Sequence, residues 1–125
     1  MAQRIGTSTV LLESRPSVLS FAAIGGKKER QGPLGALFDA TSDDTTFGKA
    51  TWEKAEAQMQ KLAMETALSK ASIRPEAVDF VFAGDLLNQC ISSSFGLMAL
   101  GIPFLGQYGA CSTMAQTIAA AGVFL

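Results

Sequence analysis

A cysteine near the end of the chain has the surroundings of a reactive thiol. Cys111 and Ser112 follow the small residues Gly109 and Ala110, and a very apolar helix is predicted at 114–125. The N–H groups and dipole at a helix N-terminus stabilise a thiolate or hold a carboxylate, and small residues permit a sharp turn. The pattern therefore indicates a cysteine nucleophile or an anion-binding turn, although a small buried hydrophobe also fits this position.

A second polar turn, at residues 84–89, contains a carboxylate and an amide. Asp85 and Asn88 come directly after a nearly continuous apolar run at 78–84. Ligands of α/β proteins bind at the carboxyl ends of parallel strands, so both side chains could face the same crevice as Cys111. They could equally cap the helix that is predicted to follow.

The chemistry that these residues could support has clear limits. An acyl-transfer cysteine usually needs a histidine as base, and the chain contains no histidine, so a base would have to come from elsewhere. Cys90 is interpreted as a packing residue. The sequence contains no P-loop, dinucleotide fingerprint or zinc-ligand spacing, so we predict neither a cofactor nor a metal.

Strands and helices alternate along residues 17–125, which predicts an α/β fold with a mainly parallel sheet in the order β-α-β-α-β-α. The predicted strands lie at 17–24, 78–84 and 104–108, and the predicted helices at 49–72, 90–100 and 114–125. Thr51 is a possible N-cap of the first helix, and its apolar stripe, which begins at Trp52, is expected in the core. Residues 27–48 are predicted to be a long loop, and residues 1–16 form a polar lead.

The charge distribution divides the chain. It has a net charge of −1, which gives no electrostatic footprint for nucleic acid, and no charged side chain occurs in residues 86–125. Polar side chains interrupt that segment too often for a membrane span, so we expect it to be buried on nearly all sides. The chain stops in mid-pattern, and we expect it to be part of a longer protein or to need a partner. Two cysteines and no apolar signal segment predict a reducing, intracellular compartment.

Several stretches, in the same order, resemble the stage V sporulation protein AD family, which is similar to thiolases. The resemblance is carried by five segments: Gln31 to Gly35, Trp52 to Glu56, Phe82 to Gln89, Gly101 to Leu105 and Tyr108 to Thr113. Gly-Asp-Leu-Leu-Asn-Gln and Gly-Ala-Cys-Ser-Thr are the more specific of these motifs. The resemblance implies a thiolase-like fold, of which residues 17–125 would be the N-terminal half-domain.

The resemblance also implies a function. Members of the family are understood to bind dipicolinic acid and to act with other proteins of the same operon in moving it into the developing spore and releasing it at germination. Such a protein would lie peripheral to the inner spore membrane and would meet the membrane only through partners. The ligand-binding residues would be Cys111, Ser112, Asp85 and Asn88, with Cys111 at the nucleophile position of thiolases. Thiolase-like proteins dimerise, and the segment Phe104 to Tyr108 would lie near that interface.

Two other functions fit the same residues. One is an acyltransferase, similar to a thiolase or ketoacyl synthase, that uses Cys111 as its nucleophile. The other is a structural subunit of a sporulation membrane complex whose pocket is vestigial. An acyltransferase would be acylated at Cys111 by an acyl-CoA, whereas a binding protein would not.

Overall fold

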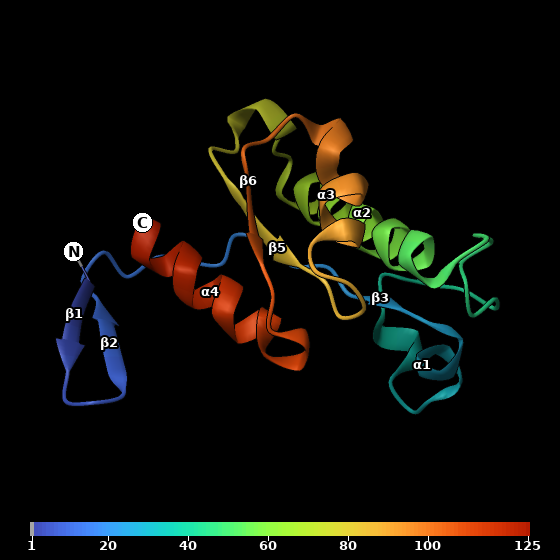
Figure 1. Ribbon diagram of the computed structural model, residues 1–125, viewed down its shortest axis with the longest axis horizontal. Helices are drawn as coiled ribbons and strands as arrows, with labels where there is room; N and C mark the ends of the chain where they lie inside the picture. The colour runs from blue at the N-terminus through green and yellow to red at the C-terminus, as the bar shows by residue number, and fades with distance from the viewer. Residues whose placement is uncertain (1) are drawn as a thin grey trace.

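The computed structural model describes residues 2–125, so Met1 lies outside the described part of the chain. Within it the chain is a mixed α/β structure, as the alternating pattern predicts (Figure 1). The helices are α1 (Lys27–Gln31), α2 (Trp52–Ala71), α3 (Ile91–Leu97) and α4 (Thr113–Phe124). The strands are β1 (Ala2–Ile5), β2 (Thr9–Leu12), β3 (Ile24–Gly25), β4 (Ala40–Thr41), β5 (Val81–Gly84) and β6 (Phe104–Gln107). Short 3₁₀ turns are η1 (Gly35–Leu37), η2 (Pro75–Ala77), η3 (Met98–Leu100) and η4 (Ala110–Ser112).

The strands form small separate sheets instead of the one mainly parallel sheet that was predicted. Over residues 2–125, β3 pairs with β4 and β5 with β6 in parallel, whereas β1 and β2 form an antiparallel hairpin. The polar lead therefore contains a hairpin, and the predicted long loop contains α1, η1 and β4. The parallel β5–β6 pair, with Val81 opposite Phe104 and Gly84 opposite Gln107, is the part of the predicted sheet that positions the site.

The strand predicted at 17–24 is wrong for all but its last residue, because the backbone and side chains of this segment bond elsewhere. The Ser20 hydroxyl donates to the Ala67 carbonyl of α2 over 2.6 Å. Ala23 exchanges two bonds with Asp39: its N–H donates to the Asp39 carboxylate and its carbonyl accepts from the Asp39 N–H, both over 2.9 Å. The Ala23 N–H and the neighbouring Lys70 amine hold the pKa of Asp39 below its usual value.

Helix α2 is the element that the sequence predicts best. Its Ala, Glu, Lys, Gln and Met residues favour helix, and the Thr51 hydroxyl accepts from the Lys54 N–H over 3.3 Å, as an N-cap does. The helix ends where Ser72 adopts a left-handed conformation and donates its N–H to the last turn. The core expectation fails at Trp52, whose side chain at the first helical position is 58% exposed.

The buried core lies where α2, α3 and β5 meet. Ala55, Val81 and Leu97, one from each element, are its fully buried apolar side chains among the described residues. Gly96 permits the close approach of α3 to α2, since a Cβ there would lie 2.6 Å from the Ala57 carbonyl oxygen. Figure 1 shows the β5–β6 pair between this two-helix layer and α4.

The expected burial of residues 86–125 does not hold for this chain. Met114, Ile118 and Phe124 of α4 are each more than 60% exposed, and the first two line the open cavity that this helix shares with α2 and β5. On its inner side α4 does pack: the Phe124 ring makes edge contacts with Phe80 and Phe82 of the β5 segment, at centroid separations of 5.6 and 5.1 Å. An apolar pattern all around a helix predicts burial only where other chain is present to cover it.

Candidate functional site

Two turns meet at the carboxyl end of the β5–β6 pair. The first, residues 84–89, follows β5; the second, residues 108–113, follows β6 and contains Cys111. Gly84 brings them together, because a Cβ on this residue would collide with the Gln107 carbonyl and would lie 2.8 Å from the Thr113 methyl group. The structure thus places the two predicted polar turns side by side, at the end of parallel strands where ligands of α/β proteins bind.

Asp85 is a buried cap of helix α3. Its side chain is fully buried, and its two carboxylate oxygens accept from the Ser92 and Ser93 N–H groups over 2.5 and 2.8 Å. These N–H groups belong to the first turn of α3, which has no other side-chain cap. The hydroxyls of Ser92 and Ser93 are themselves buried without a hydrogen-bond partner among the described residues. Of the two interpretations of Asp85, the structure shows the helix cap.

The Asn88 side chain does not cap helix α3 but bonds to helix α2. Its amide donates to the Glu53 carboxylate of α2 over 2.9 Å, and the residue at the N-cap of α3 is Cys90. The N–H of Glu53 itself, the Thr51 hydroxyl and this amide together hold the pKa of Glu53 below its usual value. Asn88 therefore anchors the 84–89 turn to α2, and the capping interpretation is wrong for this residue.

Two further α2 side chains bind the same turn, and sequence reasoning missed both. The Glu56 carboxylate accepts from the Leu86 N–H over 2.6 Å and more weakly from the Leu87 N–H over 3.4 Å, and the Gln60 amide donates to the Gly84 carbonyl over 3.2 Å. Glu53, Glu56 and Gln60 are spaced by three and four residues, so they lie on one face of the helix. This spacing could have indicated the role of Glu56 and Gln60 from the sequence, but an ordinary solvent-exposed helix face has the same spacing.

Cys111 lies in the 3₁₀ turn η4, directly before α4, and not within the helix. Its side chain is exposed, so the interpretation as a small buried hydrophobe is wrong here. The turn is closed by its own polar groups: the Ser112 hydroxyl donates to the Gly109 carbonyl over 2.8 Å, and the Gly109 N–H donates to the Thr113 hydroxyl over 3.1 Å. Because Ser112 bonds backwards, α4 has no side-chain cap at this residue.

Cys90 contacts the same strand end from the other side. It adopts a left-handed backbone conformation, with φ of 58°, and its thiol lies 3.5 Å from the Gln107 carbonyl. A Cβ at Gly106 would lie 2.8 Å from this sulfur, so the thiol fills the space beside β6. This is the packing role predicted for Cys90.

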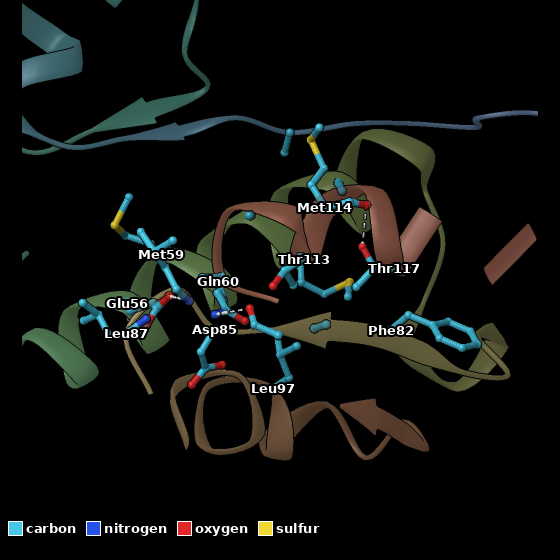
Figure 2. Close-up of a pocket in the computed structure, with 18 of the residues that line it drawn as sticks. Glu56, Met59, Gln60, Phe82, Asp85, Leu87, Leu97, Thr113, Met114 and Thr117 are labelled. Atoms are coloured by element: carbon cyan, nitrogen blue, oxygen red, sulfur yellow. Dashed lines mark hydrogen bonds between the residues drawn. The ribbon is translucent and has the colours of Figure 1, made fainter. Parts of the chain in front are cut away.

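A cavity of about 960 Å³ opens between α2, β5 and α4, beside the two turns (Figure 2). Its walls are mostly apolar, and Asp85, Ala110 and Thr113 bring the two turns into its lining. Among the described residues, Cys111, Ser112 and Asn88 lie outside the lining. Glu56 and Asp85 are the charged residues of the lining, and both are acidic. The cavity therefore suits an apolar group better than an anion.

No group of three or more His, Cys, Asp or Glu side chains is arranged to hold a metal ion within residues 2–125. In the same part of the chain, no helix combines the length and apolar character needed to cross a bilayer.

The family can be decided by comparison with known proteins. The family model described as stage V sporulation protein AD matches residues 6–125. The chain belongs to the stage V sporulation protein AD family. A curated relative, stage V sporulation protein AD of Bacillus subtilis (strain 168), is 39% identical over 120 residues, which cover 96% of this chain.

The matched region contains every site residue described above, but it is only part of the relative. The chain spans 36% of the length of the Bacillus subtilis protein. Both turns lie in the stage V sporulation protein AD match, whereas all of strand β1 lies before it. For this chain, family membership therefore shows the role in sporulation that the family description names, and no finer activity.

Proposed function

We propose that this protein binds dipicolinic acid and takes part in its uptake into the developing spore and its release at germination. It would do so in a multi-protein spore membrane complex with other proteins of the same operon, and would meet the inner spore membrane through them. The observation that carries the proposal is that the two family motifs meet at one strand end, with the Cys111 turn exposed before α4. Dipicolinic acid is a flat pyridine ring with two carboxylates, so it needs an apolar surface and an anion-binding turn together.

Electrostatics indicate how the ligand would lie. The cavity lining carries the acidic residues Glu56 and Asp85, which repel a carboxylate. The N–H groups that begin α4 lie beside Cys111 and Ser112 and have no side-chain cap at Ser112. We therefore place one ligand carboxylate at this helix start and the ring toward the apolar wall that includes Ala110.

The test is a calorimetric titration of dipicolinic acid into the protein, extended to the full length of its relatives, with Cys111→Ala run beside it. We expect saturable binding that Cys111→Ala weakens by about tenfold, which corresponds to about 1.4 kcal/mol. Cys90→Ser is the matched control: it changes the other thiol, which is half-buried against Gln107, and should bind as the parent does. Absence of heat in the parent protein would contradict the proposal.

The same variants separate the proposal from an acyltransferase. In that reaction the Cys111 thiolate would attack the carbonyl of an acyl-CoA, the carbon–sulfur bond to coenzyme A would break, and free coenzyme A would leave. The exposed position of Cys111 favours this second candidate, whereas the absence of histidine from the chain opposes it. A thioester on Cys111 after incubation with acyl-CoA, found by peptide mass, would favour the enzyme. Partner binding with neither adduct nor dipicolinate heat would favour a structural subunit.

We also propose that the protein forms a homodimer through the segment Phe104 to Tyr108. Strand β6 is bonded to β5 along one edge, and no strand within residues 2–125 pairs with its other edge, which could therefore pair with a second copy. Tyr108 is 42% exposed at the end of this strand. Sedimentation equilibrium should give twice the chain mass, and Tyr108→Lys should weaken the dimer because like charges would face each other across a two-fold axis. Phe95→Lys, on the exposed side of α3, is the control, and a monomer at all concentrations would contradict the proposal.

A further inference from the structure

A row of three α2 side chains holds the 84–89 turn. Glu53, Glu56 and Gln60 bond to Asn88, to the Leu86 and Leu87 N–H groups, and to the Gly84 carbonyl, respectively. Glu56 differs from the other two because its carboxylate accepts from two consecutive backbone N–H groups. It is half-buried and lines the cavity, and its bond to the Leu86 N–H, at 2.6 Å, is the shortest of those that the three side chains make to the turn.

The 84–89 turn also packs closely against the turn that contains Cys111. Gly84 leaves no free space toward the Gln107 carbonyl or the Thr113 methyl group. Thr113 holds the other turn through its hydroxyl, which accepts from the Gly109 N–H over 3.1 Å. A shift of the Gly84 backbone toward β6 would therefore displace Gln107 or Thr113, and with them the turn that presents Cys111.

We infer that Glu56 is a positioning residue for the Cys111 site, where the proposed function, on which this inference rests, places the ligand. Glu56 fixes the backbone of Leu86 and Leu87, and this fixes the distance between the two turns. It acts through the turns and does not touch the ligand carboxylate, which its own charge would repel. The orientation of the Cys111 thiol and the width of the cavity beside Ala110 then depend on the Glu56 carboxylate of helix α2.

The test uses Glu56→Gln and Glu56→Asp, with Glu65→Gln as the matched control. Glutamine keeps the length of the side chain but offers one acceptor oxygen for two N–H groups. Aspartate keeps the charge but withdraws the carboxylate from Leu86, so it separates position from charge. Glu65 is on the same helix, and its partner is Lys61 at a distance of 3.8 Å, away from the turn.

Two readouts are needed: the alkylation rate of Cys111 by iodoacetamide, followed by peptide mass with added glutathione as reference thiol, and the affinity for dipicolinic acid. We expect both Glu56 variants to change the ratio of the Cys111 rate to the glutathione rate by about tenfold, and to weaken binding by a similar factor, since small displacements at a site have effects of this size. Glu65→Gln should change neither. Reactivity equal to the parent in both Glu56 variants would overturn the inference.

The outcomes keep this inference apart from the proposed function. If the parent protein binds no dipicolinic acid, the proposed function fails, but the alkylation rates still test whether Glu56 positions Cys111. A purely structural role of Glu56 would lower the unfolding midpoint and leave the ratio of the Cys111 rate to the glutathione rate unchanged. If Glu56→Gln does not fold, the charge-retaining Glu56→Asp supplies the same comparison.

Discussion

Gly84→Ala should destabilise the protein by about 3 kcal/mol or more, measured as the shift in the midpoint of denaturant unfolding. The added Cβ would collide with the Gln107 carbonyl and lie 2.8 Å from the Thr113 methyl group. The first of these atoms belongs to the backbone of the paired strand β6, so it cannot rotate away as a side chain can. The substitution must therefore separate the β5–β6 pair at its carboxyl end, where the two turns of the site meet.

Gly26→Ala is the matched control for this prediction. A Cβ at Gly26 meets no atom within 4 Å, and the backbone there is in an ordinary extended conformation. Gly26 is the N-cap residue of α1, where alanine is less favourable than glycine, so the effect of Gly26→Ala should stay within about 1 kcal/mol. If Gly84→Ala proves as mild as this control, the close contact between the two turns is not a constraint on the fold, and the argument for Glu56 loses its mechanical link.

The elements that sequence predicted well are those whose determinants are local. Helix α2 has a capping threonine and helix-favouring residues over five turns, and the structure shows both, whereas the left-handed stop at Ser72 was not predicted. The β5–β6 pair also follows from local signals, because short apolar runs ending in polar turns are typical of buried parallel strands. The two turns of the site come after these strands, so their proximity was predictable as well.

The failures concern features that depend on distant partners. The pattern at 17–24 favours a strand, but a strand needs a neighbour, and this segment bonds instead to Asp39 and to the Ala67 carbonyl. The apolar surface of α4 predicts burial, but burial needs covering chain. The role of Glu56 was hidden for the same reason, because its hydrogen-bond partners lie 30 and 31 residues along the chain.

Asp85→Ala should cost about 3 kcal/mol of stability, because it leaves the buried Ser92 and Ser93 N–H groups without an acceptor. An unsatisfied buried polar group costs about 1–3 kcal/mol, and the loss of a helix cap alone about 0.5–2 kcal/mol. Water cannot easily replace the carboxylate, since the side chain of Asp85 is fully buried. Asp85→Asn should be intermediate, because its amide oxygen can accept one N–H while its NH₂ group faces the other donor.

Denaturant unfolding and ligand titration on the same variants distinguish the two interpretations of Asp85. A cap predicts a large loss of stability, whereas a ligand-binding carboxylate predicts weaker dipicolinate binding with stability close to that of the parent. Asp79→Ala, at an exposed aspartate just before β5, is the control and should leave both quantities unchanged. If Asp85→Ala is as stable as Asp79→Ala, the two N–H bonds of 2.5 and 2.8 Å do not stabilise α3, and the family motif at 84–89 must be explained by its contact with ligand.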